Sequence, residues 1–380
     1  MSPVGAGFGH INLNVRDILT VKGCFYSALG PILDIEIIRC RLGESVLTEK
    51  LLKGLTWPLQ EGRFSGFSFA DGVAGAAPRL GFGGVIEAKS ASPEIEEITR
   101  FDLASLTKVY TATIAAILHT DGAIDLEAPL SSWATLSQEL GQVTSLELLT
   151  HSSGLPSEWA EQASRQATID ELLSLKPSLA QRGDLLYSCT GYGLFSVALE
   201  QHLGMRFDLI VSKYLLDPLG LSETSYRPDE ADSLLANSHE SHFNKPYGLV
   251  HDPRARAMDG VSGNAGLFAS ANDVFLFLEE LASGDKKVVS GPARDLLFRP
   301  MVSGEWQQAL GLRYLDSERL GDQDFHFSHS GFTGTLAMID PETKHIAVLL
   351  TNRLSCETTP SQMAEVYRAF ASSVSLAPKY

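Results

Sequence analysis

The hydrophobic positions of this chain change their spacing several times along its length. Between residues 47 and 62, Leu51, Leu52, Leu55 and Leu59 recur as on one face of a helix. Two short runs at 66–72 (GFSFADG) and 79–88 (RLGFGGVIEA) are typical of strands. Residues 105–122 are helical in pattern, apolar on most sides, and end at a glycine. We expect this helix in the middle of a domain.

Helical patterns then continue to about residue 290, and strand patterns return after residue 305. Helices are predicted at 191–202, 207–216 and 272–282, the last capped by Ser270 or Asn272. Strands are predicted at 310–315, 333–340 and 345–351, with a tight turn at 340–343 between the last two. A final helix is predicted at about 361–373.

Strands at both ends of the chain, with helices between them, predict an α/β fold. We expect an antiparallel sheet built from N- and C-terminal strands and flanked by helices, with a mainly helical subdomain inserted at about 123–290. One domain would span 48–380, and 1–47 would be an extension of uncertain role. Residues 9–36 resemble the opening strand and helix of a glyoxalase-type metal-binding module, but its other strands and its ligands are missing. We interpret them as a docking arm or a fused remnant.

Composition narrows the class of protein and its partners. The 380 residues are 44% hydrophobic and 20% charged, as in ordinary globular proteins. A net charge of -16 repels phosphate backbones and anionic lipids, which disfavours nucleic acid and membrane surfaces as partners. We expect a small molecule or short peptide as substrate. The oligomeric state stays open.

The termini and cysteines bear on compartment and cofactors. The N-terminal residues lack the pattern of a secretory signal, and there is no uninterrupted apolar run of about 18 residues, so a cytoplasmic protein without a membrane span is expected. The four cysteines are scattered, which favours free thiols over disulfides or zinc ligands. We interpret His239-Glu240-Ser241-His242 as solvated, because the spacing of H-E-x-x-H is one residue short. No metal and no cofactor are predicted.

Three motifs could carry chemistry. Ser105 and Lys108 lie one helical turn apart at the start of the apolar helix, where a lysine could activate the hydroxyl and the helix dipole favours an oxyanion. The bare S-x-x-K pattern also occurs at 283–286, which we interpret as a solvated turn. Tyr187 precedes a helix, and His329-Ser330-Gly331 lead into a strand, where Gly331 would leave room for a substrate.

In combination these motifs, together with FDLASLTK, THSSGLP and LLTNR, resemble the serine β-lactamase and penicillin-binding-protein superfamily. The resemblance runs from about residue 48 to the C-terminus and is to the class C β-lactamase-like branch, which includes D-Ala-D-Ala carboxypeptidases, D-aminopeptidases and some carboxylesterases. It implies Ser105 as nucleophile and Lys108 and Tyr187 as proton carriers, either of which could be the base. It also implies an oxyanion hole from the backbone of Ser105 and Phe332, and substrate contacts from His329 and Ser330.

Two departures from the family pattern concern the substrate. Cys189 stands where many members have an asparagine that contacts the acyl-amide side chain, and a thiol bonds weakly, which favours an ester. His329 stands where many β-lactamases have lysine, and is more usual in relatives that act on D-amino-acid peptides. We therefore expect a serine hydrolase of D-amino-acid peptides or β-lactam-like amides, with a carboxylesterase, or a non-catalytic binding protein, as alternatives.

Overall fold

The computed structural model describes residues 46–374, apart from 230, 232–233, 284–287, 317–319 and 322–324, and five short strands between residues 12 and 41. Among these residues eleven strands form one sheet whose pairs are all antiparallel. In spatial order they are β1 (Asn12–Asn14), β2 (Ile18–Lys22), β5 (Glu36–Arg41), β7 (Arg79–Gly84), β6 (Gly66–Val73), β16 (His345–Thr351), β15 (Thr335–Ile339), β14 (Phe327–Gly331), β13 (Arg313–Tyr314), β12 (Gln307–Gln308) and β11 (Val302–Ser303).

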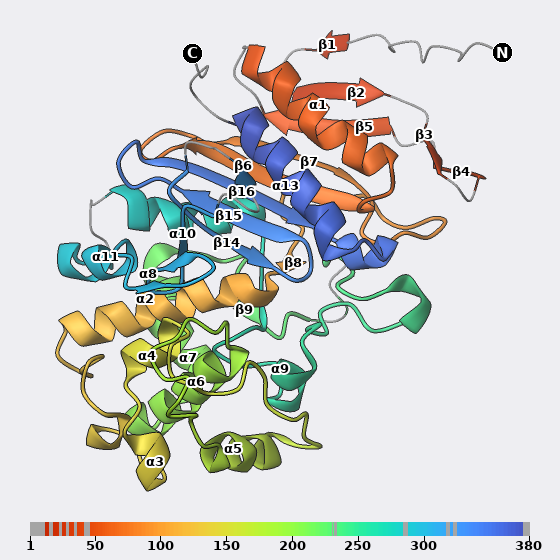
Figure 1. The fold of residues 1–380 in the computed structure, drawn as a ribbon. Coiled ribbons are helices and arrows are strands. Elements are labelled where there is room, and N and C mark those ends of the chain that lie inside the picture. The colour runs from red at the N-terminus through yellow and green to blue at the C-terminus, as the bar shows by residue number, and fades with distance from the viewer. Residues whose placement is uncertain are drawn as a thin grey trace.

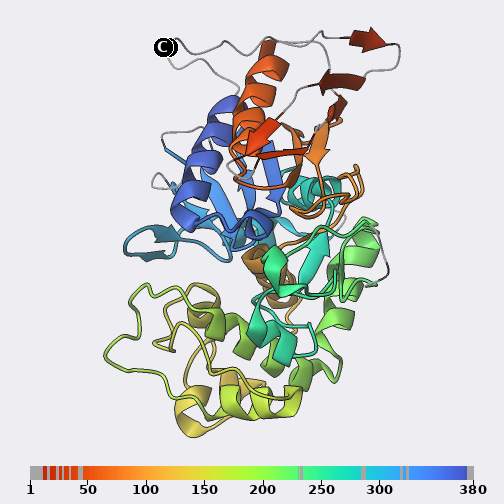
Figure 2. The same ribbon diagram turned by 90° about the vertical axis from the view of Figure 1, so that its right-hand side faces the viewer.

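The sheet joins the two ends of the chain, as the strand patterns predicted. β6, from the N-terminal part, pairs along its whole length with β16, from the C-terminal part. Figure 1 shows this central sheet with helices on both faces, and Figure 2 shows the mainly helical part of the chain beneath it. The predicted fold class is confirmed.

Each face of the sheet has its own hydrophobic core because successive strand residues point to opposite sides. In β16, Ala347 and Leu349 face α1 (Val46–Gln60) and α13 (Pro360–Val374), where they meet Leu55 and Phe370. The alternate residues Ile346, Val348 and Leu350 belong to the larger core on the other face. That core contains α10 (Ala271–Ser283) and reaches α2 (Thr107–Thr120), whose residues 107–118 are all buried.

The remaining helices and small strands lie mostly between β7 and β11 in sequence. The helices are α3 (Gln138–Gly141), α4 (Ser145–Leu149), α5 (Arg165–Ser174), α6 (Cys189–Leu203), α7 (Phe207–Val211), α8 (Asp217–Leu219), α9 (Pro253–Ala257) and α11 (Gly291–Leu297). A second sheet contains β8 (Phe101–Asp102), β10 (Leu267–Ala269) and β9 (Ser225–Tyr226), and β3 (Phe25–Ser27) pairs with β4 (Gly30–Leu33).

Several element boundaries differ from the sequence prediction. The strand predicted at 79–88 ends at Gly84, whose φ of +82° turns the chain away from the sheet. The strand predicted at 310–315 shrinks to Arg313–Tyr314, because Gly311 has a φ of +76° and its Cα lies against α2, where an added Cβ would be 2.5 Å from the Ala112 Cβ. The predicted helix 207–216 ends in a π-helical turn, Ser212–Leu216. At Gly311 tertiary packing overrides the local pattern.

The N-terminal segment adds strands to the sheet. β5 pairs with β7, and β2 pairs with β5, so these two strands extend the sheet beyond the predicted hydrolase domain. The resemblance to a glyoxalase-type module implied a helix after its first strand, whereas β2, β3 and β4 occupy that stretch. That expectation is wrong for the described residues. The proposed division at residue 48 stays a prediction.

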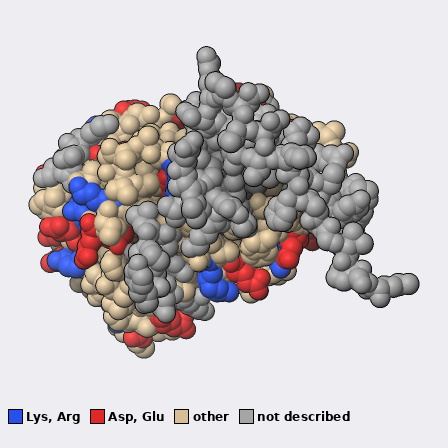
Figure 3. All heavy atoms as spheres, turned by 90° about the horizontal axis from the view of Figure 1, so that it is seen from above, with Lys and Arg blue, Asp and Glu red and all other residues tan. Residues whose placement is uncertain are grey.

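The distribution of charged side chains and the apolar character of the helices describe the surface of the protein. Seen from above, acidic and basic side chains occur in small mixed groups over the part of this face that the structure describes (Figure 3). None of the described helices combines the length and apolar character that crossing a membrane requires.

Candidate active site

Ser105 lies in a tight turn between the small sheet and the central helix. A single turn of 3-10 helix, η1 (Ala104–Leu106), joins β8 to α2, so the serine is at the N-terminal end of the buried helix. Ala104 has a φ of +45°, a conformation that costs energy for a residue with a Cβ. The Asp102 carboxylate holds the turn by accepting the Ala104 N–H at 2.8 Å. This contact fixes the backbone of the turn, whereas neither η1 nor α2 has a side-chain cap at its N-terminus.

Lys108 is fully buried and directed at the nucleophile. Its Nζ lies 3.0 Å from Ser105 Oγ, 3.0 Å from the carbonyl oxygen of Asn264 and 3.5 Å from Cys189 Sγ. An ammonium group has three protons, and these three atoms can accept all of them. A neutral amine in the same place would have one lone pair, and this lone pair could accept the hydroxyl proton of Ser105. The geometry thus serves both protonation states of the lysine.

Opposing influences set the pKa of Lys108. Burial lowers it, because the charged form loses its hydration. Negative charge on Cys189 and Tyr187, together with hydrogen bonding to Tyr187, raises it, and the net direction is upward.

His151 holds Tyr187 in place from both sides. The His151 carbonyl oxygen accepts the N–H of Leu186 at 2.9 Å, and its Nδ1 lies 3.0 Å from the Ser188 N–H. The two rings also pack, with centroids 4.4 Å apart. Tyr187 is half-buried, and the Lys108 Nζ lies 5.1 Å from the centre of its ring. These contacts fix the segment of chain that carries the tyrosine.

Cys189 is placed by the start of α6. Ser188 caps this helix by accepting the N–H of Gly191 at 3.2 Å, and the Cys189 N–H bonds the carbonyl of Ser157 at 2.7 Å. The thiol therefore faces Lys108 from a fixed backbone. Cys189 and Cys356 are free thiols, as predicted, and Cys24 lies outside the described residues.

The third motif forms the end of β14. His329 is buried, with its ring centroid 6.3 Å from that of Tyr187, and Ser330 is half-buried. Phe332, just past the strand, is 53% exposed at the edge of the site. Gly331 lies against the nucleophile turn: an added Cβ would be 2.5 Å from the carbonyl oxygen of Leu103. The sequence attributed this glycine to room for substrate, and the structure adds a packing reason.

Two contributors were missed by the sequence analysis. Arg313 on β13 places its guanidinium 5.6 Å from the Tyr187 ring centre and 4.0 Å from that of Trp306, and pairs with Asp316 at 3.7 Å. Asn264 contributes its backbone carbonyl to Lys108. An arginine in a predicted strand was the only available signal for the first. A backbone carbonyl leaves no signal in side-chain patterns, so the second could not have been found.

The structure thus brings Ser105, Lys108, Tyr187 and Cys189 into one cluster with the end of β14. The sequence of the chain matches a known family. A family model described as "Beta-lactamase" matches residues 48–370. The chain belongs to the beta-lactamase family. This membership makes the protein a serine hydrolase and confirms the resemblance seen in the sequence.

Individual relatives agree with this assignment. The chain is 29% identical over 301 residues to the N-acetylmuramyl-L-alanine amidase of Bacillus subtilis, covering 67% of this chain and 68% of that protein. It is 26% identical over 306 residues to a Salmonella agona protein named "Putative D-alanyl-D-alanine carboxypeptidase", covering 67% and 69%. Among solved structures, a class C beta-lactamase mutant has a TM-score of 0.72 at 19% identity, covering 87% of this chain and 98% of that one. EstCE1, described as a hydrolase with promiscuous acyltransferase activity, has a TM-score of 0.68 at 21% identity, covering 85% of this chain and 98% of that one. The two structures show a shared fold.

Proposed function

We propose that this serine hydrolase forms an acyl-enzyme on Ser105 and cleaves amide bonds of D-amino-acid peptides or β-lactam-like compounds. The observation that carries the proposal is the 3.0 Å contact between the fully buried Lys108 Nζ and Ser105 Oγ. A buried lysine is costly to a fold, so one directed at a hydroxyl on a helix N-terminus favours a chemical role. The names of the amidase and carboxypeptidase relatives support amide substrates.

The chemistry follows from the arrangement of the cluster. Ser105 Oγ attacks the carbonyl carbon, and its proton passes to the Lys108–Tyr187 pair. The backbone N–H groups of Ser105 and Phe332 stabilise the negative oxygen of the tetrahedral intermediate. The pair then gives its proton to the leaving nitrogen, and the C–N bond breaks. Water hydrolyses the Ser105 ester by the same proton route, which releases the acid and restores the serine.

Recognition of the substrate is assigned to β14. The half-buried Ser330 hydroxyl and the His329 imidazole would contact a substrate carboxylate, as in a peptide that ends in a D-amino acid. The Arg313 guanidinium, beside Tyr187, adds positive charge to this side of the cluster. Such a site favours a small anionic substrate, which fits the expected partner class.

Covalent labelling tests the nucleophile. A fluorescent penicillin should label the wild-type protein at one site, and mass spectrometry should place the adduct on Ser105. Ser105→Ala should abolish the label. Ser283→Ala is the matched control, because Ser283 begins the second S-x-x-K sequence but ends α10, and it should label as the wild type does. Labelling that persists in Ser105→Ala would contradict the proposal.

A carboxylesterase is a second candidate, favoured by Cys189. Its thiol lies 3.5 Å from Lys108 Nζ, where an asparagine would offer an amide to the acyl side chain of the substrate. Short p-nitrophenyl esters and D-alanyl-p-nitroanilide, compared on the same preparation, distinguish the two activities. Esters are intrinsically more reactive than anilides. The esterase would be favoured if the ratio of ester to anilide kcat/KM is much larger than the ratio of the uncatalysed hydrolysis rates of the two substrates.

A further inference from the structure

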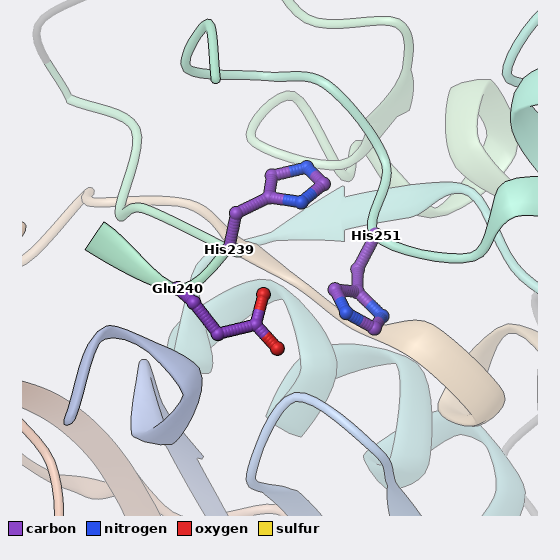
Figure 4. Close-up of side chains that lie close together, drawn as sticks. All are labelled: His239, Glu240 and His251. Carbon is purple, nitrogen blue, oxygen red and sulfur yellow. The ribbon is translucent and has the colours of Figure 1, made fainter. Parts of the chain in front are cut away.

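Three potential metal ligands outside the serine cluster lie close together. They are His239, Glu240 and His251, and one ligand atom of each lies within 4.8 Å of those of the other two. His239 and Glu240 precede the short helix η4 (Ser241–Phe243), and His251 precedes α9. Figure 4 shows the three side chains directed at a common space, His239 from above, Glu240 from the left and His251 from the right. Two loops thus supply one set of donors.

These side chains differ from the solvated histidines that the sequence predicted. His239 is only 4% exposed, so that interpretation is wrong for it, while His242, three residues on, is exposed. The His239 Nε2 lies 3.0 Å from the carbonyl oxygen of Leu249. Because a carbonyl can only accept, Nε2 carries the proton and Nδ1 keeps its lone pair. An imidazole that donates one N–H to a backbone carbonyl is the usual state of a metal-bound histidine.

The backbones that carry the donors are also fixed. The Asn237 side chain accepts the His239 N–H at 3.1 Å and donates to the His239 carbonyl at 3.0 Å. The His251 N–H donates to the Asp102 carboxylate at 2.7 Å.

We propose that His239, Glu240 and His251 form a binding site for a divalent transition metal ion, and for zinc in particular. Two histidine nitrogens and one carboxylate are a common zinc ligand set, with a water in the fourth position. Donors at a radius of about 2.1 Å in a tetrahedron lie about 3.4 Å apart. From within 4.8 Å, each donor reaches that geometry by moving less than about 1 Å, which side-chain rotation provides.

The site lies next to the serine cluster. The His251 ring stacks on the ring of Phe332, with centroids 5.2 Å apart and an interplanar angle of 23°. The His251 backbone bonds Asp102, which in turn holds the nucleophile turn. A bound ion would therefore fix His251 between two parts of the serine cluster. Metal binding itself does not depend on the proposed function, whereas any effect on acylation does.

Cobalt serves as a spectroscopic probe of the proposed site. The chelator-treated full-length protein is titrated with Co²⁺, and zinc affinity is measured by competition. One equivalent should bind with the intense visible absorption of four-coordinate cobalt. Glu240→Gln and His251→Gln should each lower the zinc affinity by at least about 100-fold. His242→Gln is the matched control, because His242 lies in the same loop and contacts Glu357 instead of the cluster. It should bind as the wild type does.

Thermal unfolding gives a second readout that is independent of activity. Zinc should raise the unfolding midpoint of the wild type, His242→Gln and Ser105→Ala, but not that of Glu240→Gln. The Ser105→Ala arm separates this proposal from the proposed function, because it lacks the nucleophile and keeps the ligands. The proposal is overturned if the wild type binds no stoichiometric ion at micromolar concentrations. It is equally overturned if Glu240→Gln and His251→Gln bind as tightly as the wild type.

Discussion

Replacing Lys108 by methionine separates a catalytic role of this side chain from a structural one. The lysine is fully buried, and its Nζ contacts Ser105 Oγ, Cys189 Sγ and the carbonyl of Asn264. Methionine fills a similar volume without a charge or a donor. Proton transfer by a positioned group contributes about 10²–10⁴-fold to a rate. We expect kcat/KM to fall about 10³-fold, equivalent to about 4 kcal/mol of transition-state stabilisation.

The same substitution should change stability much less. Loss of the hydrogen bond to the buried Asn264 carbonyl costs about 1–3 kcal/mol. Methionine also removes the cost of burying a charge, which offsets part or all of that loss. We therefore expect the free energy of unfolding to change by less than about 2 kcal/mol, in either direction.

The assay is the hydrolysis of a p-nitrophenyl ester, with urea unfolding measured on the same preparations. Lys213→Met is the matched control, because Lys213 is an exposed lysine that lies 5.2 Å from the Tyr214 ring centre and away from the serine cluster. It should leave kcat/KM unchanged. A Lys108→Met protein that keeps more than a tenth of the wild-type kcat/KM would refute the reasoning. An activity loss fully explained by unfolding would show that the lysine is structural.

Three further predictions concern the neighbours of this pair. Gly331→Ala places a Cβ 2.5 Å from the Leu103 carbonyl oxygen, so the free energy of unfolding should fall by about 1–3 kcal/mol. Urea unfolding measures this loss, and kcat/KM should fall with it. Unchanged stability would contradict the packing argument. Cys189→Asn supplies the missing amide, and the ratio of anilide to ester kcat/KM should rise; a constant ratio would argue against recognition at this position. Burial raises the pKa of Asp102 to about 6 from 3.8, so its neutral form is favoured by folding. The stability contributed by that neutral form is present below pH 3.8 and is lost as the pH rises through 6, by about 3 kcal/mol in total. Urea unfolding between pH 4 and 7.5 measures this loss, and the Asp102→Asn protein should lack it. If the free energy of unfolding changes with pH in the same way in both proteins, the prediction is refuted.

The local elements of the fold were predictable from the sequence because they depend on short-range spacing. The helix after Ser105 and the strand at 345–351 were assigned almost to their observed bounds. Each has a long apolar pattern that can be recognised without knowledge of distant contacts. Boundaries failed where a distant contact controls the backbone. Gly311 is one example, because its positive φ accommodates α2, which lies some 200 residues earlier in the chain.

The sequence by itself placed Ser105 and Lys108 one helical turn apart at the start of an apolar helix, because the pattern of residues 105–122 is helical. Only the tertiary structure decided what surrounds them. The Asn264 carbonyl meets Lys108 from 156 positions away, and His151 brackets Tyr187 through backbone bonds that side-chain patterns do not record. The pairing of His239 with His251 was likewise invisible, because each histidine sits in an irregular loop whose path follows from packing. Periodicity specifies local conformation, whereas convergence of loops depends on the whole core.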